Sequence, residues 1–111
     1  MAVKLKNLIP AKFIENTQTT QFTATTSTAI DKFTVTNTSA ATAKFSCNLV
    51  ISAGTASTSN LVLKEKTILA GETYVCPELV GHSLESGGFI STLADTASAL
   101  VIRVSGREIT S

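Results

Sequence analysis

The sequence predicts an all-β fold, an antiparallel β-sandwich or jelly roll of about eight short strands with one short helix. One observation is alternation, because Thr and Ser alternate with apolar residues in stretches such as 33–36, 45–47 and 89–92. Alternation is typical of a strand with one face on a core and one face exposed. A second is spacing, because turn residues separate the apolar stretches every 8–12 positions or so. A third is that no long segment repeats with the period of a helix.

Length and charge indicate one domain and exclude some partners. With 111 residues the chain reaches a common domain size and can bury a core. We interpret residues 1–15 as an N-terminal arm with an edge strand and residues 16–111 as one β-sandwich domain. The nine Lys and Arg residues are scattered and the formal charge is +1. Nucleic-acid binding requires a clustered basic face, so we expect no nucleic-acid partner.

The sequence also predicts no membrane partner. No window approaches the roughly 18 apolar residues of a membrane span. Lys4 and Lys6 interrupt the continuous apolar stretch that a signal peptide needs. We therefore expect a protein that is made in a cytoplasmic compartment.

The first part of the chain predicts two exposed edges. Aliphatic residues surround Pro10, which excludes a central strand position, so we expect an arm with an edge strand near residues 11–15. The tract 16–28 is rich in Thr and Gln and has one large apolar residue, Phe22. Because Thr favours strands and the tract lacks Pro and Gly, we expect an exposed edge strand around residues 19–25.

Half-buried strands are expected through the middle of the chain. Residues 30–37 direct Ile30, Phe33 and Val35 inward, and a turn follows. Alternation resumes over residues 43–52. The residues of this second stretch that share one face are Phe45, Cys47, Leu49 and Ile51.

The second half predicts short strands around one helical turn. Pro77 suits the first position of a short helix over residues 77–84, with Leu79, Val80 and Leu84 against the core. Gly106, near the end of the last strand, indicates a bulge or a close backbone approach. A polar loop is expected at residues 54–60 and a solvated charge run at 64–66. The remaining strands are expected at residues 61–63, 67–69, 73–76, 89–93 and 100–105.

Two cysteines, Cys47 and Cys76, lie in apolar, strand-like stretches. Free cysteine in such a setting behaves as a small buried hydrophobe. We expect a reduced, buried pair, as is usual in a cytosolic setting. The alternative is a disulfide, which would need facing strands with closely spaced Cα atoms.

Residues that could carry catalysis do not gather in the sequence. The single histidine, His82, has Glu78 and Glu85 at helical spacings, which predicts surface pairs. No second residue has the spacing of a metal ligand. Ser105 precedes a glycine but does not follow one, unlike the serine of a nucleophile elbow. We therefore predict that the protein is not an enzyme and uses no metal and no cofactor.

The order of turns in the second half carries a resemblance to a known family. A strand runs into a small polar loop over residues 48–60. The stretch 68–74 (Ile-Leu-Ala-Gly-Glu-Thr-Tyr), a glycine-rich stretch at 78–88 and a final strand at 101–109 follow. In size and pattern the chain resembles the jelly-roll decoration, or staple, proteins on the heads of short-tailed bacteriophages. The resemblance covers about residues 30–109 and rests on turn placement.

That resemblance implies a virion structural protein that is assembled in the host cytoplasm. Such a protein binds the outside of the capsid, bridges subunits of the major capsid protein and associates as a dimer. An edge strand can pair with a partner by strand addition, and exposed aliphatic residues on a small protein usually have a partner. We therefore expect the contact on the arm (Val3, Leu5, Leu8 and Ile9) and on the Thr-rich edge (Thr19, Gln21, Thr23 and Thr25).

Alternatives to this prediction stay open at two levels. Within the arm, Leu8, Ile9 and Phe13 could instead cap the sandwich core. For the whole protein, one alternative is a carbohydrate-binding or adhesin-like module, which would require Tyr74 or Phe22 to form an exposed aromatic platform. The other is a ring protein in the neck or tail of the same virion, which only symmetry would distinguish.

Overall fold

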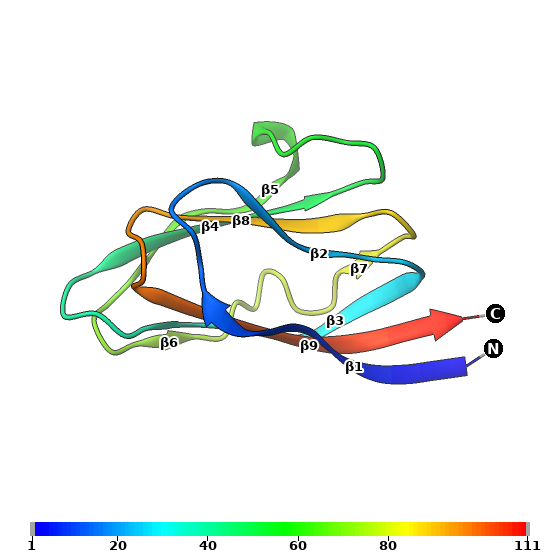
Figure 1. The fold of residues 1–111 in the computed structure, drawn as a ribbon, viewed down its shortest axis with the longest axis horizontal. Helices are drawn as coiled ribbons and strands as arrows, with labels where there is room; N and C mark the ends of the chain where they lie inside the picture. Colours follow the sequence, from blue (N-terminus) through cyan, green and yellow to red (C-terminus); the bar gives the residue numbers. More distant parts are fainter. Residues whose placement is uncertain (1, 111) are drawn as a thin grey trace.

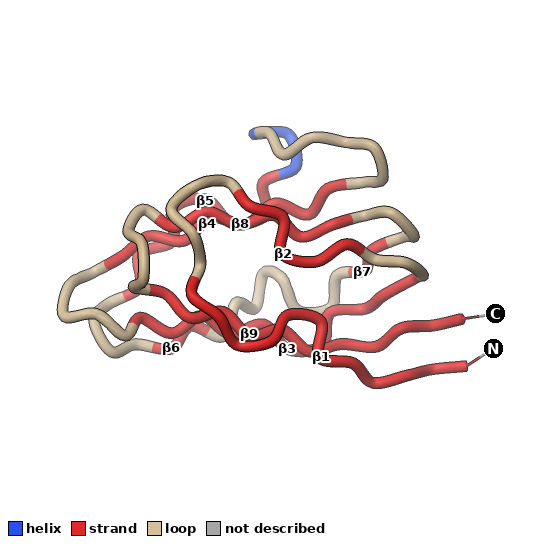
Figure 2. The backbone as a smooth tube through the Cα atoms, viewed as in Figure 1, coloured by secondary structure: helices blue, strands red, loops and turns tan. Residues whose placement is uncertain are grey.

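Two antiparallel sheets pack face to face in the computed structural model, which describes residues 2–110. Sheet A has the strand order β1-β9-β3-β6, with β7 also paired to β3, and sheet B has the order β2-β8-β4-β5. Figures 1 and 2 show the two layers, with both ends of the chain at the same end of the molecule. The predicted all-β sandwich is confirmed, with nine strands in the described residues.

The strands differ greatly in length. Sheet A consists of β1 (Ala2–Phe13), β3 (Ser27–Asn37), β6 (Thr73–Tyr74), β7 (Ser83–Leu84) and β9 (Leu100–Thr110). Sheet B consists of β2 (Thr19–Thr23), β4 (Ala43–Val50), β5 (Leu61–Ile68) and β8 (Phe89–Ala94). The one helix within residues 2–110 is a single 3-10 turn, η1 (Thr58–Asn60), which Ser57 caps.

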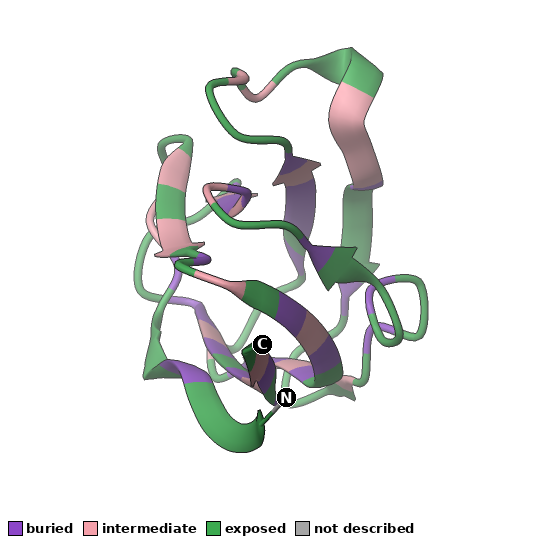
Figure 3. Ribbon diagram, turned by 90° about the vertical axis from the view of Figure 1, so that its right-hand side faces the viewer, coloured by how far each residue is buried: buried purple, intermediate pink, exposed green. Residues whose placement is uncertain are grey.

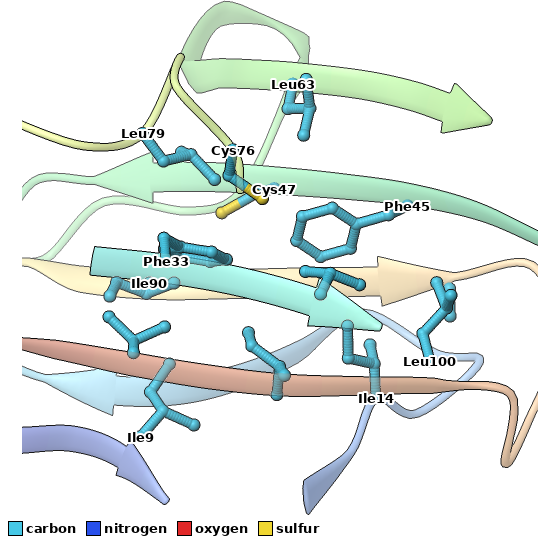
Figure 4. Close-up of a cluster of buried hydrophobic side chains, with 14 of the residues drawn as sticks. Ile9, Ile14, Phe33, Phe45, Cys47, Leu63, Cys76, Leu79, Ile90 and Leu100 are labelled. Carbon is cyan, nitrogen blue, oxygen red and sulfur yellow. The ribbon is translucent and has the colours of Figure 1, made fainter. Parts of the chain in front are cut away.

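The core lies between the inward faces of the two sheets (Figure 4). Phe33 of sheet A and Phe45 of sheet B meet at its centre, with ring centroids 6.1 Å apart. The inward positions expected for Ile30, Phe33 and Val35 are confirmed. Ile51 was expected inward but is exposed, because β4 ends at Val50 and the chain leaves the sheet there.

The N-terminal edge strand is longer than expected. Instead of a strand near residues 11–15, β1 pairs with β9 from Ala2 opposite Thr110 to Phe13 opposite Val101. Its register shifts twice, between Asn7 and Ile9 and between Ile9 and Lys12. Pro10 lies at the second irregularity of an edge strand, where its missing N–H costs no sheet hydrogen bond.

The helix expected at residues 77–84 is not formed. Cys76 and Gly81 both have positive φ, and positive φ interrupts a right-handed helix. Gly81 N–H donates to the Ile30 carbonyl, and Ile30 N–H donates to the His82 carbonyl. The segment is therefore a turn held against β3. Leu79 is buried, as expected, whereas Val80 is exposed.

The structure decides three further expectations. A Cβ at Gly106 would collide with the Ala29 carbonyl oxygen, so the expected close backbone approach is confirmed. Cys47 and Cys76 are free and fully buried, as expected, and their side chains point toward each other in Figure 4. The two stretches expected on either side of the charge run form one strand, β5, with an irregularity at Glu65, whose φ is 48°.

Candidate functional site

The candidate contact surface begins on β1, which has an exposed part and a buried part. Residues 2–7 are all exposed, with Val3 at 57% and Leu5 at 78% of their full exposure. Leu8 and Ile9 are only 5% and 1% exposed and belong to the core. Figure 3 views this end of the molecule, with both termini toward the reader. Two of the four predicted arm residues therefore lie on the surface, and the other two cap the core.

Alternation places the two exposed aliphatic residues on the outer face of sheet A. Lys6 leans toward sheet B, because its Nζ lies 3.0 Å from Glu108 Oε2 and 5.9 Å from the centroid of the Phe22 ring. Neighbouring side chains in a strand point to opposite faces. Val3 and Leu5 therefore point outward, beside their β9 partners Ile109 and Arg107.

A shallow depression of about 370 Å³ adjoins Leu5 on this outer face. Its lining includes Asn7, Asp31, Arg103 and Ser105. Beside it, the Arg107 Nε lies 3.0 Å from Asp31 Oδ2, an exposed ion pair. Arg103, in contrast, forms no ion pair within residues 2–110. The depression thus offers an unpaired guanidinium, polar groups and an aliphatic rim.

The fold gathers cations that are scattered in the sequence. Strands β1, β3 and β9 carry six of the nine Lys and Arg residues and only two carboxylates, Asp31 and Glu108, for a formal charge of +4. The rest of the chain carries three Lys residues against six carboxylates, for a formal charge of −3. The near-zero net charge therefore conceals a basic side of the sandwich.

The predicted Thr-rich edge is the edge strand β2, which pairs only with β8. Thr23 and Thr25 are exposed, whereas Thr19 is half-buried and donates from its hydroxyl to the Thr17 carbonyl. Gln21 Nε2 donates to Glu15 Oε1 and to Thr92 Oγ1, so this amide is engaged within the molecule. Of the four edge candidates, Thr23 and Thr25 have the side chains most open to a partner.

Close to this edge, ion pairing and hydrogen bonding act on a single carboxylate, Glu15. The hydrogen bond from the Lys12 ammonium, at 2.8 Å, holds the Glu15 pKa below its usual value, and the Gln21 amide lowers the pKa further. The carboxylate therefore stays ionised and keeps the chain between β1 and β2 fixed.

A polar network on the outer face of sheet B was not anticipated from the sequence. Gln18 Nε2 donates to Asn48 Oδ1 and to Ser91 Oγ. Asn48 Nδ2 donates to the Ser57 carbonyl and to Asn60 Oδ1, which holds the 51–60 loop over the sheet (Figure 1). Single Asn and Gln residues in a Thr-rich chain give no sequence signal of such a network.

Two adjoining depressions of about 240 Å³ each flank this network. They share Ser46, Glu65 and Leu93. Glu65 N–H donates to Ser46 Oγ at the irregularity of β5, and this hydrogen bond supports the positive φ of Glu65. Within residues 2–110, no buried side-chain nitrogen or oxygen atom lacks a hydrogen-bond partner.

The aromatic residues named for sugar binding do not form an exposed platform. Phe22 and Tyr74 are partly buried against the core. Lys66 Nζ lies 4.8 Å from the centroid of the Tyr74 ring and covers its face. Burial, helped by a hydrogen bond to the Glu78 carboxylate, raises the pKa of Tyr74 to about 12. Tyr74 is thus part of a packed edge between the two sheets.

His82 is exposed, and its backbone carbonyl accepts from Ile30 N–H. Within residues 2–110, no three His, Cys, Asp or Glu side chains come together in a way that could hold a metal ion. No helix of this part of the chain is long and apolar enough to cross a membrane.

Comparison of the chain with protein-family models, with curated proteins and with solved structures finds no match.

Proposed function

We propose that this protein is a structural protein of a bacteriophage virion. In this role it binds the outside of the capsid and stabilises contacts between subunits of the major capsid protein. Val3 and Leu5 support the proposal most directly, because they are exposed aliphatic residues held on a regular strand at the edge of a sheet. Exposed apolar residues gathered with Arg are typical of protein interfaces.

The rigidity of the surface supports a stapling role. Val3 and Leu5 are already held by the pairing of β1 with β9, so little conformational freedom is lost on docking. Modest contacts repeated over a lattice of subunits add up to a large avidity. The turn pattern that resembles the phage decoration proteins supports the same role. Self-association as a dimer is part of this proposal.

A carbohydrate-binding role has less support. It required an exposed aromatic platform at Tyr74 or Phe22, and both residues are partly buried. A position in the neck or tail would use the same fold, and the site of binding on the particle separates it from the capsid role.

The test is binding to heads of the phage that encodes the protein, prepared without it. Deletion of residues 2–9 is a poor variant, because it removes Leu8 and Ile9 from the core and leaves β9 as a new edge. Leu5→Ser is better, and Ile51→Ser is its matched control, since Ile51 is 79% exposed and lies at the end of β4 in the other sheet.

We expect wild-type protein and Ile51→Ser to sediment with the heads in a fixed ratio to the major capsid protein. Leu5→Ser should lower the affinity by about tenfold, the effect of losing roughly 1.4 kcal/mol of apolar contact. Wild-type protein that stays in the supernatant at all concentrations would overturn the proposal.

A further inference from the structure

We infer that β1 docks an extended, acidic segment of its partner by strand addition, so that this segment becomes the next strand of sheet A. The inference rests on the proposed function, because it names the partner's chemistry at the surface proposed for capsid binding. Three features support it: an open strand edge, unpaired positive charge beside it, and a pattern of charge that disfavours a second copy of this chain.

The edge of β1 is long and open. β1 has 12 residues and pairs only with β9, so one side of its backbone has no neighbouring strand within residues 2–110. Its first part, residues 2–7, is exposed on both faces. An edge of this kind presents a row of N–H and C=O groups that match an incoming strand.

The charge beside the edge favours carboxylates. Lys4 is exposed and forms no ion pair within residues 2–110, and the same holds for Arg103 on the neighbouring strand β9. Opposite charges directly across two strands stabilise their pairing. A segment with carboxylates facing Lys4 and aliphatic side chains facing Val3 and Leu5 would therefore complement both faces of β1.

The same charges disfavour a second copy of this chain on β1. A two-fold axis perpendicular to the sheet pairs a strand antiparallel with its own copy and keeps each side chain on its own face. When the axis passes beside Lys4, this lysine lies opposite Lys4 of the second copy, and the same holds for Lys6. Centred on Leu5, the pairing sets Lys4 against Lys6. Like charges directly opposite one another destabilise a sheet, so the registers centred on the exposed stretch from Lys4 to Lys6 disfavour a second copy and favour a different chain as the partner.

The surface also fits a protein segment better than a nucleic acid. Val3 and Leu5 alternate with the lysines, and residues 2–7 carry no aromatic side chain on which bases could stack; the exposed Phe13 lies at the opposite end of β1. Single-stranded nucleic acids are bound mainly by aromatic stacking within a basic groove.

The docking mode can be tested with the full protein and three probes. One is a short blocked peptide that alternates Glu with Val or Thr, the second replaces each Glu by Lys, and the third is single-stranded oligo(dT). Hydrogen exchange reports on the amides of residues 2–7. The acidic peptide should slow their exchange by about tenfold at a concentration of ten times its Kd. Equal protection by the lysine peptide, stronger protection by oligo(dT), or no protection would each overturn the inference.

Reversing the charge of Lys4 tests strand addition separately from capsid binding. Lys4→Glu should weaken both peptide protection and head binding by about tenfold. Lys64→Glu is the matched control, because Lys64 is an exposed, unpaired lysine on the edge strand β5 of the other sheet. If wild-type protein binds heads and Lys4→Glu binds them equally well, strand addition is wrong and capsid binding stands. If the acidic peptide protects β1 but heads do not bind wild-type protein, capsid binding is wrong and the docking mode stands.

Discussion

At the scale of single residues, Gly106 is where sheet A depends on the absence of a side chain. The backbone of β3 passes so close that a Cβ at position 106 would meet the Ala29 carbonyl oxygen and, at 2.8 Å, Leu8 Cδ1. The register of β3 against β9 also shifts here, between Ile30 and Lys32. The sequence could indicate a close backbone approach at this glycine. It could not indicate that Ala29 and Leu8 are the residues approached, because they lie on the distant strands β3 and β1.

Gly106→Ala should therefore lower the free energy of unfolding by about 1–3 kcal/mol through overpacking. Urea denaturation measures the change. Ser105→Ala, at a half-buried outward position of the same strand, serves as the control and should stay within about 0.5 kcal/mol of wild type. A Gly106→Ala variant as stable as this control would contradict the close approach.

The two buried thiols predict a loss of stability at alkaline pH. Burial raises the pKa of both from the ordinary value of 9.0, with Cys76 reaching about 12. Secondary contributions come from Cys76 for the Cys47 thiol and from Glu78 for the Cys76 thiol. Above pH 9 the unfolded chain loses thiol protons that the folded chain retains, so the folded state binds more protons and stability falls as pH rises.

The free energy of unfolding should thus fall between pH 9 and about 12, the interval set by the two values for Cys76. In Cys47→Ala/Cys76→Ala the fall should be shallower by about 1.4 kcal/mol per thiol for each pH unit in this interval. Urea denaturation at a series of pH values measures both slopes. Equal slopes would show that the thiols do not titrate differently on unfolding.

At the scale of elements, β1 combines an exposed segment, residues 2–7, and the buried residues Leu8 and Ile9 in one continuous strand. Leu8→Ala removes a buried side chain and should cost about 2–5 kcal/mol of stability. Leu5→Ala removes an exposed one and should change stability by no more than about 0.5 kcal/mol, while it weakens head binding. Thermal denaturation of the two variants measures the contrast. Equal destabilisation would mean that residues 2–7 also pack against the core.

The elements that could be predicted from the sequence are those whose pattern is local. Alternation over residues 30–37 and 43–52 predicted two strands, which the structure contains as β3 and β4, although β4 ends at Val50. Such a pattern is local, since inward and outward residues are neighbours in sequence. The segment 77–84 could not be predicted this way. Its backbone forms hydrogen bonds with Ile30 of β3 instead of continuing into another helical turn. The full length of β1 was likewise missed, since it depends on pairing with β9 at the other end of the chain.

At the scale of the whole molecule, the fold gives the protein a basic side that its sequence conceals. The strands β1, β3 and β9 are far apart in the chain and adjacent in sheet A, so their cations add up only after folding. For the proposed contact surface, the sequence named Val3 and Leu5, and the structure shows that both are exposed. The sequence could not separate them from Leu8 and Ile9, because the register shift that places Ile9 opposite the buried Val104 is set by β9.

The molecule is also elongated, 46 × 26 × 19 Å, and both termini lie at the end where β1 is exposed (Figure 1). A narrow sandwich of this shape can lie along the boundary between neighbouring subunits and present the length of one edge to them. The proposed capsid role thus requires a defined orientation, with β1 toward the coat and sheet B turned away from it.

The most direct test of capsid binding is cryo-electron microscopy of phage heads with and without the protein. Capsid binding through β1 predicts additional density of sandwich size on the outer surface of the shell, at a boundary between coat subunits, with the β1 edge against the coat. Density confined to the neck or tail, or a sandwich whose β1 edge faces solvent, would contradict it.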